Sequence, residues 1–145
     1  MAIYTHPLTP CIPAIQLTFS ESAFKAILAD WQSAGTDDRF KKHFALDFPF
    51  LVSYGVLGFL VSTRTRLFQN FSRPVKSLLS YTLPVAAVAD AIENLMHLYF
   101  LSGAAPFISA QYLVAGVVAS TKWLLILSFV GCALYAYCKK SPRCR

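Results

Sequence analysis

Three long stretches with almost no charge constrain the fold of this chain more than any other feature. Residues 48–63 contain no Lys, Arg, Asp or Glu, and residues 77–101 and 107–138 contain very few. A helix that crosses a bilayer needs about 20 consecutive, mostly apolar residues. The sequence therefore predicts an all-α protein built as a transmembrane bundle of three spans.

The composition agrees with a membrane environment. Of the 145 residues, 56% are hydrophobic and 14% are charged, whereas a soluble domain has about 25% charged residues. The chain has 6 Gly and 4 Cys, which is too few for a collagen-like repeat or a disulfide scaffold. Its length suits one compact unit, and we expect the lipid bilayer to be its main partner.

The basic residues gather beside the apolar stretches, mainly in residues 25–42, 64–76 and 139–145. Cations in these positions set the topology of membrane proteins, whereas a nucleic-acid-binding protein carries a basic face on a soluble fold. We therefore expect no nucleic acid as a partner. Three spans put residues 64–76 and 139–145 on one side with no acidic residue, so the positive-inside rule predicts that the basic tail, residues 139–145, is cytoplasmic.

Two segments precede the spans. Residues 1–17 are predicted to form an extended, proline-containing arm without the basic start of a signal peptide. Residues 18–42 are predicted to form an amphipathic helix followed by a charged turn at residues 36–42. Thr18 and Glu21 have the spacing of a capping box, and Gly35 is suited to end the helix. Its apolar stripe has helical spacing and consists of Phe24, Ile27, Leu28 and Trp31.

This N-terminal helix is too short to cross a bilayer. We expect the helix to lie in the membrane interface with Trp31 as an anchor; the alternative is that it docks against the spans.

Residues 43–138 are the predicted transmembrane domain. The first span covers residues 44–63, and the second covers residues 77–101 with a bend expected at Pro84. Residues 107–138 are longer than one crossing needs and admit two interpretations. We favour one helix from Tyr112 to Cys138 after a re-entrant or interfacial turn, and the alternative is two short spans that divide near Thr121.

Several polar side chains lie inside these apolar segments. A charge at the centre of a span costs about 2.5–3.5 kcal/mol on insertion scales, so such groups must be paired, neutralised or directed into a wet cavity. At 100° per residue, the polar residues 90, 93, 94 and 97 share one face of the second span, and residues 47 and 122 lie on small-residue faces of the other two. The predicted intramembrane cluster is Asp47, Asp90, Glu93, Asn94, His97 and Lys122.

The charges of this cluster do not balance in a simple way. Lys122 offers one positive charge to Asp90 and Glu93, so either one carboxyl is protonated, His97 is cationic, or a bound cation completes the balance.

Three functions remain compatible with the cluster. It holds the helices together; it binds a partner, proton, ion or small solute, or transports one; or it serves a lipid-active membrane enzyme. Transport would need an oligomer, because three spans are few for a pathway, so a homo-oligomer or another membrane protein is a candidate partner. In the enzyme, Asp90, Glu93 and His97 would act as a general base or hold a divalent metal. Otherwise we expect no cofactor.

Four short patterns, W31-x3-G35, L46-D47-F48-x5-Y54, D90-x2-E93-N94 and K122-W123, occur together in this chain. This combination resembles a group of small, mostly bacterial, uncharacterised integral membrane proteins, over roughly residues 19–137. The resemblance implies a multi-pass protein of the bacterial inner (plasma) membrane, with Asp47, Asp90, Glu93, Asn94 and Lys122 at its polar centre. It implies no activity.

Overall fold

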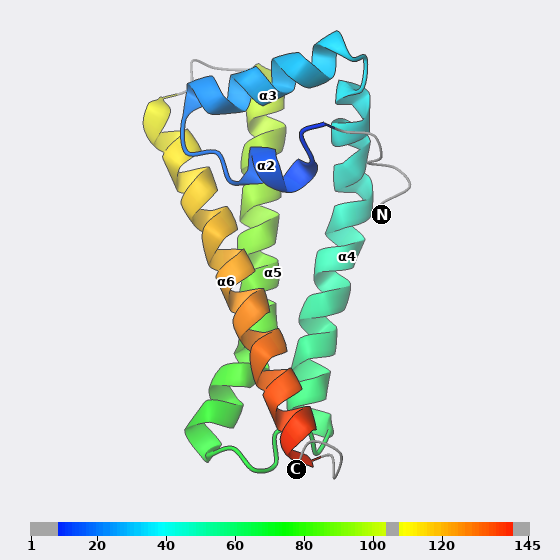
Figure 1. The fold of residues 1–145 in the computed structure, drawn as a ribbon, viewed down its shortest axis with the longest axis vertical. Coiled ribbons are helices and arrows are strands. Elements are labelled where there is room, and N and C mark those ends of the chain that lie inside the picture. Colours follow the sequence, from blue (N-terminus) through cyan, green and yellow to red (C-terminus); the bar gives the residue numbers. More distant parts are fainter. Residues whose placement is uncertain (1–8, 104–107, 141–145) are drawn as a thin grey trace.

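The computed structural model describes residues 9–103 and 108–140, which form helices and no strand. Three long helices lie side by side, and two short ones cross one end of the bundle (Figure 1). The helices are α2 (Ile12–Gln16), α3 (Glu21–Ser33), α4 (Asp37–Arg64), α5 (Arg73–Ser102) and α6 (Ser109–Lys140). The predicted all-α class is therefore confirmed.

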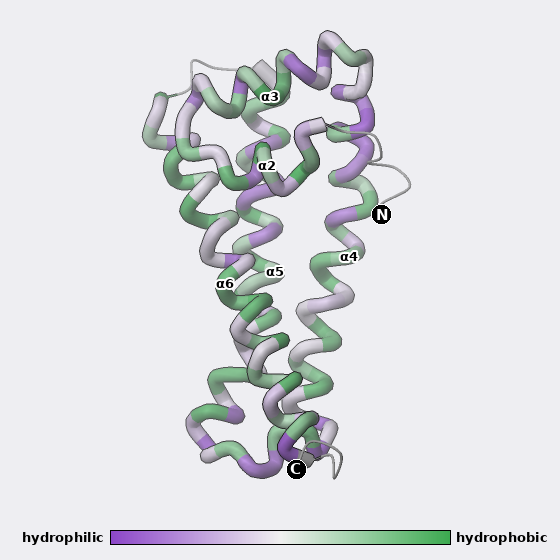
Figure 2. Tube along the Cα trace, viewed as in Figure 1, coloured by the Kyte–Doolittle hydropathy of each residue, from purple (hydrophilic) through white to green (hydrophobic). Residues whose placement is uncertain are grey.

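Helices α4, α5 and α6 are each long and apolar enough to cross a membrane. Figure 2 shows that hydrophobic residues dominate the lower part of these helices, whereas hydrophilic residues mark both ends of the bundle. Large apolar side chains remain exposed on all three helices, among them Val56, Leu78, Val88, Leu124 and Leu134. This pattern is that of a small multi-pass membrane protein, as predicted.

A charged turn was predicted at residues 36–42. For residues 37–42 this prediction is wrong, because α4 begins at Asp37. Asp37 and Asp38 lie in the first turn of α4, where negative charge interacts favourably with the helix dipole. Lys41, one turn later, lies 3.6 Å from a carboxylate oxygen of each. These charges therefore begin a helix that continues into the first span.

The stretch from 107 to 138 contains one helix and not two. Helix α6 runs without interruption from Ser109 to Lys140, so the favoured single helix is confirmed and a division near Thr121 is wrong. The turn predicted before Tyr112 is already helical from Ser109, while residues 104–107 lie outside the described part of the chain. Gly103 ends α5 in the left-handed conformation with φ 64°.

The predicted N-terminal arm contains a short helix. Residues Ile12–Gln16 form α2, with Pro13 in its first turn, where the missing N–H of proline costs nothing. Ile12 and Ile15 are buried against the bundle. The arm is therefore not extended throughout, because burying these two apolar side chains against the bundle favours the helix over an exposed, extended chain. Residues 1–8 lie outside the described residues.

Helix α3 starts two residues later than the proposed capping box suggests. Its N-cap is Ser20, whose hydroxyl accepts a hydrogen bond from the Ala23 amide at 3.3 Å. The Thr18 hydroxyl instead donates to the Ile15 carbonyl oxygen, 2.7 Å away, at the end of α2. The capping-box prediction is thus wrong, whereas Gly35, with φ 64°, follows the end of the helix as expected.

Helix α3 docks on the three long helices. Phe24 and Trp31 are buried, and the Trp31 indole N–H donates to the Pro10 carbonyl oxygen at 2.9 Å. The Phe24 ring lies 5.5 Å from the rings of both Phe100 on α5 and Tyr112 on α6. Helix α3 thus docks against the spans, and Trp31, expected to be an interface anchor, is fully buried in this contact.

Helix α5 is the centre of the bundle and packs against both α4 and α6, which contact each other far less. Glycines on α4 allow the close approach to α5: a Cβ added at Gly58 would lie 2.5 Å from the Leu83 Cβ. An aromatic cluster around Phe40 fills the α3 end of the bundle, and an apolar cluster around Phe68 and Phe129 fills the other. Between these clusters lie the polar residues.

Candidate functional site

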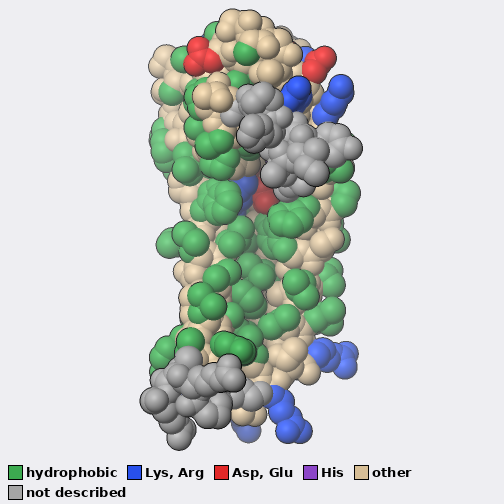
Figure 3. Space-filling model, turned by 45° about the vertical axis from the view of Figure 1, so that its right-hand side comes forward, with side chains coloured by type: hydrophobic (Ala, Val, Ile, Leu, Met, Phe, Trp, Pro, Cys, Tyr) green, Lys and Arg blue, Asp and Glu red, His purple; other side chains and the backbone are tan. Residues whose placement is uncertain are grey.

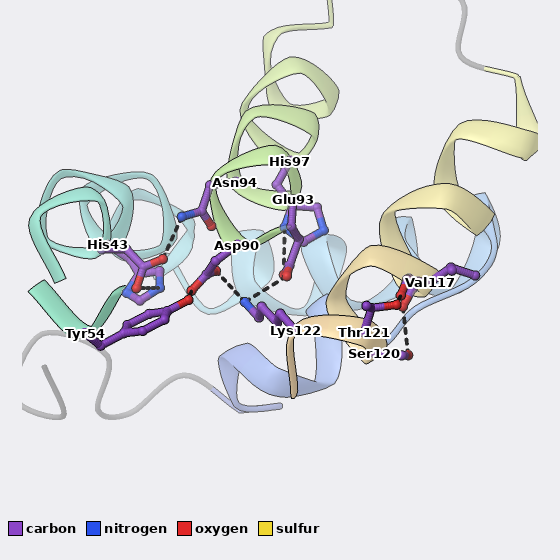
Figure 4. A network of polar contacts seen from close by, with 12 residues as sticks. His43, Tyr54, Asp90, Glu93, Asn94, His97, Val117, Ser120, Thr121 and Lys122 are labelled. Atoms are coloured by element: carbon purple, nitrogen blue, oxygen red, sulfur yellow. Dashed lines mark hydrogen bonds and ion pairs between the residues drawn. The ribbon is translucent and has the colours of Figure 1, made fainter. Parts of the chain in front are cut away.

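Lys122 of α6 connects to two acids of α5 (Figure 4). Its Nζ lies 2.6 Å from Oδ1 of Asp90 and 2.7 Å from Oε2 of Glu93. The two acids are three residues apart and so lie on the same face of their helix. One ammonium thus joins α6 to α5 through both carboxylates.

Two further hydrogen bonds connect α5 to α4. The Asn94 amide nitrogen donates to Oδ2 of Asp47 at 2.6 Å. The Tyr54 hydroxyl donates to Oδ2 of Asp90 at 3.0 Å. Asp90 therefore contacts a side chain from each of the other two long helices.

Two histidines lie at the margins of this network. His43 Nε2 is 3.7 Å from Oδ1 of Asp47, and His97 Nδ1 is 3.8 Å from Oε1 of Glu93. Both separations exceed a hydrogen bond, so each becomes an ion pair only when the imidazole is protonated. The His97 ring packs among Phe24, Phe40 and Phe100.

The structure brings all six predicted residues together, and all are buried: Asp47, Asp90, Glu93, Asn94, His97 and Lys122. His43 and Tyr54 also belong to the network, although the sequence prediction did not include them. Their signal was present, since they share a face of the first span with Asp47 at helical spacing. We call these eight residues the polar cluster.

The polar cluster contains more carboxyl groups than ammonium groups. Asp47, Asp90 and Glu93 contribute three carboxyl groups, and among the described residues of the cluster Lys122 contributes the one ammonium, which contacts Asp90 and Glu93. Placing charges in a dry interior is costly unless they are paired. If all three carboxyl groups are ionised, two more positive charges are needed for neutrality. Protonated imidazoles or a bound cationic ligand would supply them, or two of the carboxyl groups are protonated instead.

A cavity of about 500 Å³ opens beside the cluster. Its polar lining is His43, Asp47, Tyr54, Asp90 and Lys122, together with Gln16 of α2. Its apolar lining comes from all three long helices and includes Phe50, Leu83, Ile126 and Val130. In Figure 3 a basic and an acidic side chain are visible between apolar side chains on this face. Glu93, Asn94 and His97 do not line the cavity.

Two buried polar atoms near the cavity lack a hydrogen-bond partner within residues 9–103 and 108–140. They are Nδ1 of His43 and Nε1 of Trp123, and both residues line the cavity. Buried polar atoms in proteins are normally hydrogen-bonded. Each of these two residues that line the cavity therefore carries one buried polar atom without a partner among the described residues.

The arrangement of the described residues gives no support to a divalent metal held by Asp90, Glu93 and His97. Among the described residues, no three His, Cys, Asp or Glu side chains are arranged to hold a metal ion. Between Asp90 and Glu93, where the metal was considered, the Lys122 ammonium already contacts both carboxylates.

The three residues considered for an enzyme do not share one accessible surface. Asp90 lines the cavity, but Glu93 is 0% exposed and His97 lies under the aromatic cluster. A substrate in the cavity would therefore meet Asp90 without the other two.

Comparisons with protein-family models, with curated proteins and with solved structures find no match to this chain. Function must accordingly be argued from the geometry of the site.

Proposed function

We propose that this small multi-pass membrane protein binds a ligand dissolved in the bilayer, in the cavity beside its polar cluster. The observation that carries the proposal is that a cavity of about 500 Å³ has Asp47, Asp90 and Lys122 in an otherwise largely apolar wall. Ligand sites typically occupy about 300–1,000 Å³ and combine apolar walls with a few convergent polar groups.

On this proposal the polar cluster has two parts, one for helix packing and one for ligand binding. Glu93, Asn94 and His97 lie away from the cavity and contribute to helix packing. His43, Asp47, Tyr54, Asp90 and Lys122 face the cavity and are available to a ligand. Lys122 and Asp90 belong to both parts, because their ion pair joins α6 to α5 and also forms part of the cavity wall.

The position of the opening favours a ligand that arrives from lipid. Phe50 on α4 and Val130 on α6 line the cavity and are 53% and 45% exposed. Both belong to helices long and apolar enough to span a membrane. A molecule that diffuses between α4 and α6 therefore reaches the polar cluster without crossing an aqueous phase.

A proton relay across the membrane is less well supported. Such relays use chains of Asp, Glu and His, but the cluster occupies one level of the bundle. Between Lys122 and Lys139 on α6, and between Asp47 and Arg64 on α4, no Asp, Glu, His, Lys or Arg occurs. On these two helices no ionisable side chain of these types continues the cluster toward the basic end of the bundle.

We further propose that the basic end faces the cytoplasm of a bacterium, across its inner membrane. Helix α4 ends and α5 begins at the same end of the bundle as the C-terminus of α6 (Figure 1). The segments 64–76 and 139–145 carry basic residues and no acids, which the positive-inside rule associates with the cytoplasm. The resemblance to bacterial membrane proteins supports the choice of membrane.

The binding proposal is tested by analysing what copurifies with the protein. Val130→Phe places a larger side chain in the cavity, and Val117→Phe makes the same change on an exposed part of α6 outside it. Each protein is purified in a mild detergent, and its small molecules are extracted and quantified by mass spectrometry. We expect one class of amphiphile to accompany the wild type and Val117→Phe, and to be depleted in Val130→Phe. The same lipid profile in all three would contradict the proposal.

A further inference from the structure

We infer that the ligand of this cavity is an amphiphile with a cationic amine head and a single apolar chain. The inference rests on the proposed function and names the chemical class that the cavity accepts. Three features carry it: the charges at the cavity wall, an imidazole too far from Asp47 to form a hydrogen bond with it, and the apolar path that leads out between α4 and α6.

The first feature is the excess of acid at the wall. Asp47 and Asp90 both line the cavity, and the Lys122 ammonium is shared between Asp90 and Glu93. Asp47 instead accepts a hydrogen bond from the neutral Asn94 amide. Because a buried carboxylate without a cation is costly, an ammonium beside Asp47 would be strongly favoured.

The second feature is His43, which lines the cavity and is 5% exposed. Its Nε2 faces Asp47, and its Nδ1 has no hydrogen-bond partner within the described residues. In a neutral imidazole whose Nε2 carries the proton toward Asp47, Nδ1 is an acceptor. An ammonium has three donors and no acceptor, and beside Asp47 it would balance a carboxylate that a neutral imidazole 3.7 Å away does not balance.

The third feature is the apolar path. Ile126 and Val130 follow Lys122 on α6 and line the cavity opposite Phe50 and Leu83. From residue 122 to residue 130 a helix rises about 12 Å. An alkyl chain along this path would lie on apolar side chains while its head contacts the polar cluster, and its far end would reach lipid near the exposed Val130.

An anionic amphiphile suits the same cavity poorly. Its head would approach Asp47 and Asp90, and the nearby cation, Lys122, already has two carboxylate partners. Like charges in a dry site repel strongly. A neutral alcohol would avoid this repulsion but would leave the excess of acid unbalanced.

The test compares head groups on one chain. The probes are dodecylamine, 1-dodecanol and dodecanoate, each brominated near the middle of the chain so that the bromine quenches the fluorescence of a nearby tryptophan. The protein is placed in nanodiscs of neutral phosphatidylcholine, and the membrane concentration of each probe is measured. Trp123 lines the cavity and reports binding; Trp123→Phe leaves Trp31 of α3, which is fully buried and does not line the cavity, as the background signal.

We expect saturable quenching by the amine, with an affinity about 10–100-fold higher than that of the alcohol, as a hydrogen-bonded charge pair provides. Asp47→Asn should remove most of this preference, and Asp47→Glu, which restores the charge, should retain part of it. Val130→Phe should abolish saturable quenching by the amine, and Val117→Phe should not.

The two proposals fail in different ways. If the alcohol or the carboxylate binds as tightly as the amine, and Val130→Phe still blocks it, the inference is overturned and the binding site stands. If no probe quenches Trp123 saturably, both are overturned. If Asp47→Asn does not fold, the relative affinities of the three head groups for the wild type still test the preference for an amine.

Discussion

The Nζ of Lys122 lies between Asp90 and Glu93, 2.6 Å from the first carboxylate and 2.7 Å from the second. Two acids one helical turn apart repel each other when ionised, and this ammonium offsets the repulsion from a neighbouring helix. Glu93 is 0% exposed, so water contributes little to its stabilisation. This contact joins α6 to α5 and forms part of the wall of the cavity.

The bond between Asn94 and Asp47 should contribute measurably to stability. Asn94→Ala removes the donor to Oδ2 of Asp47 and leaves a buried carboxylate oxygen without it, at an expected cost of about 1–3 kcal/mol in the free energy of unfolding. SDS titration of the protein in mixed micelles measures this quantity.

Thr121→Ala is the matched control for that variant. The Thr121 hydroxyl is exposed and donates to the Val117 carbonyl oxygen of its own helix, so its loss breaks no contact between helices. Equal losses of stability in Asn94→Ala and Thr121→Ala would show that the hydrogen bond between α4 and α5 contributes no more to the free energy of unfolding than one within a single helix.

The N-terminal segment should be sensitive to a single methyl group on α6. A Cβ at Gly116 would lie 2.5 Å from the Thr18 carbonyl oxygen and 2.7 Å from the Phe19 ring, whereas a Cβ at Gly131 would meet nothing within 4 Å. We therefore expect Gly116→Ala to displace the segment that joins α2 to α3. Hydrogen exchange of the α3 amides should accelerate in Gly116→Ala.

Gly131→Ala should show wild-type exchange in α3 and a helix stabilised by about 1 kcal/mol or less, since alanine is the better helix former. Unchanged α3 exchange in Gly116→Ala would mean that the segment does not rest on α6.

The basic end of the bundle should face the cytoplasm. A reporter enzyme fused after Arg145 should be active only in the form that works in the cytoplasm, and a reporter that requires the periplasm should be inactive there. Replacement of the basic residues at 64, 66, 73 and 76 by Gln should weaken this preference, because the positive-inside rule counts cations in short loops. Activity of the periplasmic reporter on the unmodified chain would reverse the orientation.

The spans and six of the eight residues of the polar cluster were predictable because both depend on patterns within single helices. Uncharged stretches predicted α4, α5 and α6, and the 100° rotation per residue put Asp90, Glu93 and Asn94 on one face. That face also had to meet Lys122, since an isolated charge in an apolar helix is costly.

Other features depend on tertiary contacts and were missed. Residues 37–42 look like a turn because they are charged, yet Asp37 and Asp38 are favourable at the start of a helix. Helix α2 forms because Ile12 and Ile15 find a surface on which to pack. The cavity arises because α4 and α6 both pack on α5 and diverge from each other, and no pattern within one helix carries that information.

A thermodynamic cycle around Lys122 tests the central claim most directly, namely that charges from separate helices meet in a dry interior. Unfolding free energies are measured for Lys122→Met, for Asp90→Asn with Glu93→Gln, and for the three substitutions combined. Lys122→Met alone should cost about 3–5 kcal/mol, because it leaves two buried carboxyl groups without their cation. The combined variant should recover most of that loss, since no uncompensated charge remains between α5 and α6. Strictly additive losses, or a neutral Lys122→Met, would contradict the account.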